Sequence, residues 1–381
     1  MTNPCQCLRA TAAGVLAGIA LWAGLSLAPA PVRANDSIIE QQTGGLDVED
    51  LDDTDLGFRN GSLIVAPIPF SNPMIGSGLI LGAGYLFQFD PQSDPSVIGL
   101  GGLRSDNGSQ AVAAAVSLNF NSNRWKMSLG GGTADLKYDL YTGNLIIPLR
   151  QDGVLARMTL AYGVTPDLNF GLVSRYLDTT ITTQSPLFPN LPPAFQPSAD
   201  LTILNAGLEA NWDKRDNTVY PTDGFRVKLS SQRGFIVDGI GADYNKTYGL
   251  FDSYLSLGEN TVIASRAAVC HATDAAPFFD ACSLGGVDSF RGFNATQILN
   301  KRSMSTQLEL RQRLSDRIGA VLFAGIGAAG PTFDNLNQSG AAGGFGLRYR
   351  VSKKFPVDFS VDGSWNDEHE GLLYISVGQR F

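Results

Sequence analysis

The residues best suited to chemistry surround one arginine. Arg291 lies between Phe290 and Phe293, and Gly292 follows it directly. A glycine lets the backbone bend sharply or approach another surface closely, so this spacing can hold a guanidinium in a fixed place. A guanidinium inside the protein needs an acceptor, whereas one in an exposed loop meets only solvent or a weak surface partner. Residue type alone allows both interpretations.

Enzymatic chemistry has little support elsewhere in the chain. The two histidines are His271 and His369, and no glycine-x-serine-x-glycine sequence is present. No group of His, Cys and Glu residues has the spacing of metal ligands. We therefore expect no enzymatic activity, no cofactor and no metal. A phospholipase that uses His271 or His369 with a nearby serine is a remote alternative.

The N-terminus predicts export. Arg9 precedes an Ala-, Gly- and Leu-rich run, and Val32-Arg33-Ala34 supplies small side chains at the two positions that a signal peptidase reads. We predict a signal peptide over residues 1–34, with a retained membrane helix as the alternative. Residues 35–56 are acidic and cannot bury a core, so we expect a disordered, solvated linker. Cation binding or a role as a partner tail is the alternative there.

Two cysteines lie beyond the predicted cleavage site. Cys270 and Cys282 flank a short segment on the way to Arg291. In an oxidising compartment two cysteines at this spacing are more often bonded than free. We predict a disulfide that tethers the limb of the chain leading to the arginine.

Composition and charge narrow the class of protein. The 381 residues include 43 glycines, and helical periodicity is almost absent, which favours strands and turns over a helical core. The net charge is −8, and no basic cluster of the kind that tracks phosphates occurs. We expect no nucleic-acid partner.

Alternation of apolar and polar residues recurs from residue 57 to the C-terminus. In residues 303–314 the apolar positions are Met304, Leu308, Leu310 and Leu314, and the positions between them carry charged and polar side chains. That second face is too charged for a protein core. Lipid outside and water inside accounts for both faces, and only a closed barrel satisfies its backbone in hydrocarbon. We predict an all-β fold, a monomeric membrane-spanning antiparallel barrel over residues 57–381, with a soluble sandwich as the alternative.

Counting the alternating segments gives about sixteen strands. The predicted strands are 62–70, 77–89, 96–104, 109–121, 123–137, 147–163, 166–181, 201–213, 223–233, 243–257, 260–271, 302–314, 317–328, 341–351, 355–365 and 371–381. If the first strand starts in the periplasm, the long connections 182–200, 272–301 and 329–340 are all extracellular, as in bacterial barrels. The connection 272–301, which is the sixth extracellular loop in this count, carries Arg291.

Phe290-Arg291-Gly292-Phe293 resembles the arginine-glycine-aromatic motif of the BamA/TamA-like superfamily, whose members carry a bacterial surface antigen barrel of sixteen strands. Three further stretches resemble that family. They are the turn Trp212-Asp213-Lys214-Arg215-Asp216-Asn217 with Tyr220-Pro221-Thr222-Asp223-Gly224, the opening Ala66 to Pro73, and the ending Ser376 to Phe381. The resemblance implies an outer-membrane barrel whose sixth loop folds into the lumen, and it makes Phe381 part of the signal for membrane insertion.

The chain departs from the family pattern at two places. Larger relatives carry polypeptide-transport-associated domains before the barrel, and here only the acidic residues 35–56 separate the predicted signal from the first strand. The family also places an aspartate two residues after a phenylalanine to receive the arginine, but Phe323 is followed by Ala324 and Gly325. We expect Asp358 or Asp362 to receive Arg291 instead. Glu309 is the alternative.

Two prolines in the first strand suggest where the barrel closes. Pro67 and Pro69 are two residues apart, so both remove an N–H donor from the same side of that strand. We expect this side to face the last strand and its Gly378, which makes a weak seam. Alternatively, both prolines lie at the rim, beyond the ladder.

The resemblance implies a non-enzymatic role in outer-membrane biogenesis, or in transport of protein or lipid, with the lipid bilayer and client proteins or lipids as partners. A passive pore or a structural surface antigen is the alternative.

Overall fold

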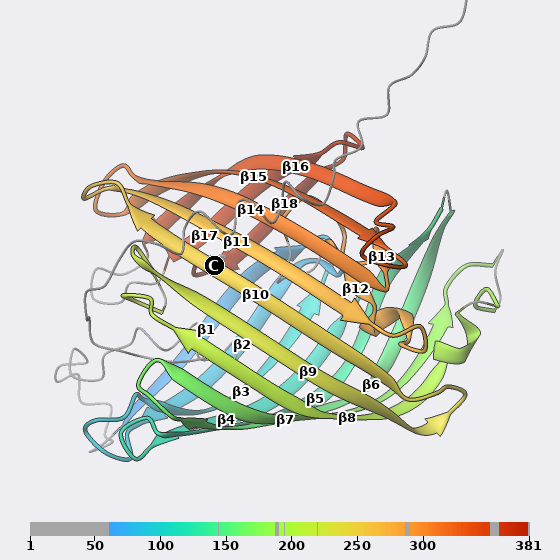
Figure 1. Cartoon of the computed structure of the whole chain (residues 1–381), viewed down its shortest axis with the longest axis horizontal. Helices are drawn as coiled ribbons and strands as arrows, with labels where there is room; N and C mark the ends of the chain where they lie inside the picture. The colour runs from blue at the N-terminus through green and yellow to red at the C-terminus, as the bar shows by residue number, and fades with distance from the viewer. Residues whose placement is uncertain are drawn as a thin grey trace, which may run out of the picture. The chain divides into compact units, whose positions relative to one another are not determined.

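The structure is a computed structural model that describes residues 61–143, 145–186, 190–193, 195–218, 220–285, 290–350 and 358–379. In these residues sixteen antiparallel strands close a barrel, in agreement with the number of strands predicted (Figure 1). The predicted signal peptide, the predicted linker and Phe381 lie outside the described residues. No helix among the described residues is long and apolar enough to cross a membrane.

The barrel strands follow the chain in order around the ring. They are β1 (Ser62–Asn72), β2 (Gly76–Phe87), β3 (Ser96–Ser105), β4 (Gln110–Phe120), β5 (Trp125–Thr142), β6 (Leu145–Gly163), β7 (Leu168–Thr183), β8 (Asp200–Asp213), β9 (Gly224–Gly239), β10 (Tyr244–Ser256), β11 (Thr261–Ala272), β14 (Arg302–Arg313), β15 (Ile318–Gly330), β16 (Gln338–Arg350), β17 (Asp358–Asn366) and β18 (Gly371–Val377). Most bounds agree with the sequence prediction within three residues. β5 and β9 each run at least five residues further than predicted.

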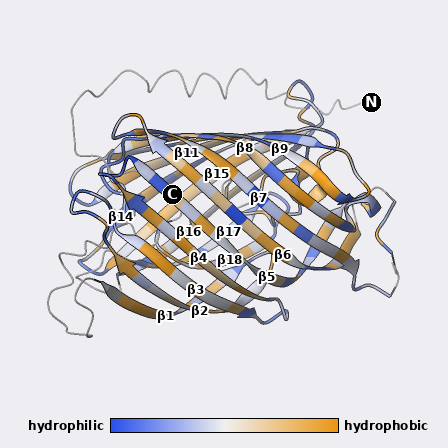
Figure 2. Ribbon diagram, turned by 90° about the horizontal axis from the view of Figure 1, so that it is seen from below, coloured by the Kyte–Doolittle hydropathy of each residue, from blue (hydrophilic) through white to orange (hydrophobic). Residues whose placement is uncertain are grey.

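Hydrophobic and hydrophilic residues alternate along the strands (Figure 2), and their exposures show that the two sets face opposite sides of the barrel wall. On β14, Leu308 and Leu310 are 58% and 40% exposed, whereas Gln307 and Glu309, which alternate with them, are 2% and 1% exposed. The apolar residues face outward and the charged residues face inward, which is the reverse of a soluble protein. This arrangement excludes the soluble sandwich.

The two longest connections of the barrel lie at the same end. We call this end, which holds the β7–β8 and β11–β14 connections 184–199 and 273–301, the loop end, and the opposite end, which holds the connections after β4, β6, β8, β10 and β14, the turn end. The segment 273–301 contains a short 3-10 helix, η3 (Phe278–Asp280), and a two-stranded sheet of β12 (Cys282–Ser283) and β13 (Leu299–Asn300). The alternation in the sequence did not predict these small elements.

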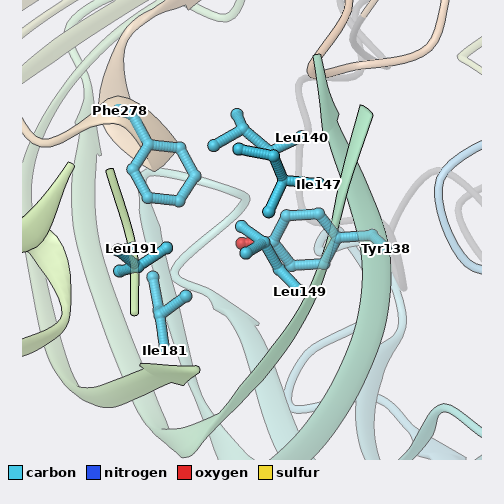
Figure 3. Packing of buried hydrophobic residues seen from close by; sticks show 7 residues of the cluster. All are labelled: Tyr138, Leu140, Ile147, Leu149, Ile181, Leu191 and Phe278. Atoms are coloured by element: carbon cyan, nitrogen blue, oxygen red, sulfur yellow. The ribbon is translucent and has the colours of Figure 1, made fainter. Parts of the chain in front are cut away.

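An apolar cluster at the loop end joins this segment to the barrel wall. Phe278 of η3 and Leu191 of the β7–β8 connection meet side chains from three strands (Figure 3). The wall residues are Tyr138 and Leu140 of β5, Ile147 and Leu149 of β6, and Ile181 of β7. Full burial of one such side chain contributes roughly 1.5–3 kcal/mol. The cluster therefore fixes η3 against β5–β7.

Candidate functional site

The side chain of Arg291 lies inside the barrel, with no exposed surface. Its Nη1 donates to Oδ2 of Asp362 on β17 at 2.5 Å, and its Nη2 donates to Oε2 of Glu309 on β14. The guanidinium lies 3.6 Å from the ring centroid of Phe323 on β15. The backbone N–H of Arg291 donates to Oε1 of Gln307 at 3.0 Å. Side chains of three strands, β14, β15 and β17, thus hold Arg291 in place.

Two further arginines contact the two carboxylates that bind Arg291. Arg311 donates through Nε to Oε1 of Glu309 at 2.8 Å, and Arg348 donates through Nη1 to Oδ1 of Asp362 at 2.5 Å. Each carboxylate therefore receives two cations. A buried charge is tolerated only when it is paired and hydrogen-bonded, so the five side chains depend on one another.

The three candidate acceptors have separate roles. Glu309 and Asp362 both contact Arg291, although the sequence analysis offered them as alternatives. Asp358 does not, and that candidate was wrong: its Oδ1 accepts from Nε of Arg350 at 3.1 Å. Asp358 and Asp362 lie on the same face of β17, but four residues separate them by about 13 Å along a strand. Only Asp362 is at the depth that Arg291 reaches.

Glycines in the wall make room for the two aromatic side chains beside Arg291. A Cβ at Gly325 or Gly327 of β15 would come within 3.0 Å of the Phe290 ring, and one at Gly340 of β16 would lie 2.4 Å from the Phe293 ring. The aspartate of the family pattern would fall at Gly325. Gly325, which stands where the family pattern has the acceptor, is therefore a position where a side chain would meet Phe290. Asp362, two strands away on β17, supplies the negative charge instead.

Gly292 has a backbone conformation that favours glycine. Its φ is +130°, and an added Cβ would lie 2.1 Å from the Cβ of Ala342 on β16. Its N–H donates to the hydroxyl of Tyr374 at 3.0 Å, and its carbonyl accepts from Nδ2 of Asn366 at 2.9 Å. The motif therefore contacts β16, β17 and β18 through its backbone.

Asp280 is a second buried charge on the same connection, and the sequence analysis did not identify it. Its Oδ2 accepts from Nη2 of Arg175 on β7 and from the hydroxyl of Tyr244 on β10, and its Oδ1 lies 4.0 Å from Nζ of Lys246. Burial by itself disfavours the ionised form, but Arg175 and Lys246 outweigh it and lower the pKa of Asp280 below its ordinary value. A lone aspartate beside two phenylalanines gives no sequence signal for this role.

The two buried charges hold opposite sides of one connection. Asp280 is bound by cations of β7 and β10, and Arg291 by carboxylates of β14 and β17. Their signs are opposite, so exchanging the two contacts would bring like charges together. The connection is therefore fixed in one direction across the barrel.

The structure joins Cys270 of β11 to Cys282 of β12 by a disulfide, with the Cα atoms 5.6 Å apart. Both cysteines are buried among Leu201, Tyr244 and Ala272. Cys282 is two residues from Asp280, so the bond holds the chain next to the first buried charge.

The two histidines are far apart along the sequence and lie near the loop end. His271 is on β11, where it pairs in register with Arg302, and His369 lies in the turn between β17 and β18. In the described part of the chain, no group of three or more His, Cys, Asp or Glu residues is placed to hold a metal ion.

We predict that Arg291→Ala releases the connection from the β14–β17 wall. Removing one partner of a buried pair commonly costs roughly 3–5 kcal/mol, here because Glu309 and Asp362 lose a shared cation. Limited proteolysis between β11 and β14 and single-channel conductance should both increase. Arg150→Ala is the matched control, since that arginine pairs with Asp135 at an exposed site, where solvent screens the attraction and the pair contributes little to stability. Unchanged proteolysis and conductance in Arg291→Ala would show that this arginine does not anchor the segment.

We predict that Asp280→Asn loosens the other half of the connection, because Arg175 is left without its carboxylate. Hydrogen exchange measured by mass spectrometry over residues 276–285 should become faster at neutral pH. Asp274→Asn, an exposed change in the same connection, should leave it unaltered.

The same contact gives the wild type a dependence on pH. Since the folded pKa is lowered, the stabilisation is present above the unfolded pKa of about 3.9 and is lost as pH falls through the folded value. Protection should therefore decrease below about pH 4 in the wild type, and should change less over that range in Asp280→Asn. Equal pH profiles would contradict the assignment of Asp280.

We predict that the peptides containing Cys270 and Cys282 are linked in the protein isolated from its membrane. In SDS without reductant a maleimide should modify neither cysteine, and after reduction it should modify both. Loss of a disulfide that closes a loop of this size costs roughly 3 kcal/mol. Cys270→Ser, which frees Cys282 for labelling without reductant, is the positive control. Modification of the unreduced wild type would disprove the bond.

The fold is similar to those of several solved barrels. BamA from Haemophilus ducreyi lacking POTRA domains 1–3 matches with a TM-score of 0.59 and 17% identity, over 84% of this chain and 70% of that one. CdiB from Acinetobacter baumannii matches with a TM-score of 0.56 and 9% identity, over 84% and 60% of the two chains. CdiB from Escherichia coli matches with a TM-score of 0.56 and 16% identity, over 85% and 63%. The chain thus spans less than two thirds of either CdiB protein, and at these identities the likeness shows the fold.

Comparison of the sequence with curated proteins found no match. A profile of the Omp85 superfamily domain matches residues 105–381, which contain both buried charges and every residue that binds them. This match confirms the resemblance predicted from the loop motif, and it places the barrel in the bacterial outer membrane. The chain belongs to the Omp85 superfamily.

Proposed function

We propose that this chain is a non-enzymatic protein of outer-membrane biogenesis, whose barrel opens between β1 and β18 to pass a client protein strand into the membrane. The observation that supports this most directly is the closure of the barrel. Among the described residues, which end at 379, β1 and β18 share one registered pair, Ser71 with Ile375, whereas β1 and β2 share eleven. Superfamily members are transporters and insertases, which agrees with this class of function.

The two prolines explain why the β1–β18 ladder is so short. Pro67 and Pro69 pair in register with Leu81 and Leu79 of β2, and the β1–β2 ladder continues past both. A ladder continues past a proline when the missing N–H would have pointed away from that neighbour. The two missing donors of β1 therefore face β18. Both prolines lie inside the ladder, so the interpretation that places them at the rim is wrong.

The register of this one pair also relates the prolines to β18. Continuing antiparallel from Ser71 and Ile375 places Pro69 opposite Val377 and Pro67 opposite Gln379. The prolines begin directly after the one registered pair, and β18 ends at Val377.

The end of β18 is held by β17 and not by β1. Gly378 has a φ of +90°, a turn conformation that glycine adopts without strain. Its N–H donates to the carbonyl of Asp358 at 2.7 Å, and its carbonyl accepts from Oγ of Ser360 at 2.6 Å. These bonds hold residues near the end of β18 against β17, and no registered pair joins the described residues 376–379 to the facing edge of β1.

An edge without a ladder is a place for another strand to add. Each missing ladder bond forgoes about 1 kcal/mol, so separating β1 from β18 is the least costly way to open the ring. An extended client segment could then pair with the freed edge through its backbone, which is strand addition. A protein client fits this edge better than a lipid, because lipid tails cannot use backbone donors and acceptors.

A passive pore is the alternative function. The connection held by Asp280 and Arg291 crosses the inside of the barrel, and this counts against a wide, steady channel. A structural surface antigen would need neither the weak seam nor the buried charges. A phospholipase is the remote alternative, and a lipid hydrolysis assay on the purified protein tests it directly.

The experiment is to lock the seam with a disulfide. Ser71→Cys with Ile375→Cys joins the one registered pair across β1 and β18, and directly opposed residues have the Cβ separation that a disulfide needs. The matched control is Ser71→Cys with Ser77→Cys, which locks β1 to its firm neighbour β2. Each variant replaces the wild type in its own cells, and the amounts of other outer-membrane proteins are measured with and without reductant.

We predict that the locked seam reproduces the effect of depleting the protein, and that reductant restores function. The β1–β2 lock should behave as the wild type in both conditions. If the locked seam retains full function while depletion lowers other outer-membrane proteins, lateral opening is ruled out. If depletion changes lipid distribution but no protein, the client is a lipid. If depletion changes neither and the protein conducts steadily in planar bilayers, the passive pore is the better function.

A further inference from the structure

The connection between β8 and β9 reaches across the turn end of the barrel. The carbonyl of Pro221 accepts from Nη1 of Arg311 on β14 at 3.3 Å. The ring centroid of Tyr220 lies 5.4 Å from Cζ of Arg313 on β14 and 5.2 Å from Cζ of Arg350 on β16. In the ring β10 and β11 separate β9 from β14, so these contacts pass over part of the opening (Figure 1).

This connection has an internal scaffold of its own. Arg215 donates through Nη2 to Oδ2 of Asp213 at 2.6 Å and through Nη1 to the carbonyl of Thr218 at 3.3 Å. The side chains of Arg215 and Asp213 are only 3% and 0% exposed. The carboxylate of Asp216 accepts from Oγ1 of Thr222 at 2.6 Å, which closes the turn. Tyr220 is therefore presented by an ordered turn.

We propose that residues 214–218 and 220–223, the turn-end latch, form a closing element for the turn end of the barrel, with Tyr220 held between Arg313 and Arg350. A cation within about 6 Å of a ring centroid is attracted to the face of the ring, and each such contact is weak when partly exposed. Two weak contacts on one ring make a closure that can open. Residue 219 lies outside the described residues and has no part in this argument.

The two arginines contribute differently to the latch. Arg350 also pairs with Asp358 at 3.1 Å, so its position does not depend on Tyr220. Arg313 forms no ion pair with a carboxylate in the described part of the chain, and its guanidinium faces the Tyr220 ring. The ring is therefore the main restraint on Arg313. Substitution of Arg313 should open the latch without breaking an ion pair of the wall.

The latch shares a carboxylate with the loop motif. Glu309 accepts from Arg291 of the loop and from Arg311, and Arg311 also donates to the carbonyl of Pro221. The loop motif thus contacts Glu309 and the latch contacts Arg311. These two residues of β14 are two positions apart and are hydrogen-bonded to each other. When Arg291 is released, Arg311 is the one arginine that still donates a hydrogen bond to Glu309. We infer that Glu309 then draws Arg311 away from the carbonyl of Pro221, which loosens the latch.

This inference does not depend on what the barrel transports. A closing element at the turn end is compatible with a transporter of protein and with a passive pore, and the seam between β1 and β18 takes no part in it. A negative result for the locked seam would leave the latch untouched, and a negative result for the latch would leave the seam untouched.

The test follows the opening of the latch through one buried position. Thr218 is 8% exposed, and Thr218→Cys places a reporter inside the latch of the complete protein. Its rate of reaction with a soluble maleimide is measured in detergent micelles, where both ends of the barrel are accessible. When closing is faster than labelling, this rate follows the population of the open latch.

Tyr220→Ala in the reporter background should speed labelling by about 5- to 30-fold, the effect of losing two cation–ring contacts. Tyr220→Phe is the matched control, because it keeps the ring and should leave the rate within about twofold of the parent. Arg313→Gln should also speed labelling, and it decides the question if Tyr220→Ala does not fold. Arg291→Ala should speed labelling through Glu309.

Four outcomes decide the proposal. Fast labelling of the reporter in Tyr220→Ala together with slow labelling in Tyr220→Phe supports the latch. Equal rates for Tyr220→Ala and the parent, or for Arg313→Gln and the parent, overturn it. Equally fast labelling of Tyr220→Phe and Tyr220→Ala also overturns it, because the ring would then not be the contact. A parent-like rate in Arg291→Ala removes the shared carboxylate from the proposal.

Discussion

The interior of this barrel depends on the pairing of a few buried charges. Arg291 lies between Glu309 and Asp362 with no access to solvent, and each carboxylate receives a second arginine from the wall. Unpaired charges inside a protein are costly, so none of these side chains can leave without destabilising the others. The position of the connection between β11 and β14 follows from this constraint, because its other buried charge, Asp280, is bound by cations on a different part of the wall.

The wall is shaped to accept that connection. Glycines of β15 and β16 leave spaces that the rings of Phe290 and Phe293 fill. The same face lacks the aspartate that the family pattern predicts at Gly325, and the acceptor comes from β17 instead. Charge pairing therefore tolerates a move of the acceptor between strands, provided that the depth along the barrel is kept. Asp358 shows the limit, since it is on the right face at the wrong depth and pairs with Arg350.

Different interactions close the ring of strands and hold the β11–β14 connection inside it. β1 and β18 share one registered pair in the described part of the chain, beside two prolines of β1, whereas the connection inside is held by side-chain charges. A change at one does not require a change at the other. The proposed turn-end latch is coupled to the connection inside the barrel, since Arg311 links it to Glu309 and so to the loop motif.

The sequence by itself determined the barrel, its sixteen strands, most strand bounds and the family, because alternation along a strand is a local property that lipid outside and water inside impose. It also singled out Arg291 and offered Glu309 and Asp362 among its partners. Only the tertiary structure decided that both bind, that Asp358 does not, that Asp280 is a second buried charge, and that β1 meets β18 at Ser71. These depend on the register between strands distant in sequence, and on depth inside the barrel, which no local pattern encodes.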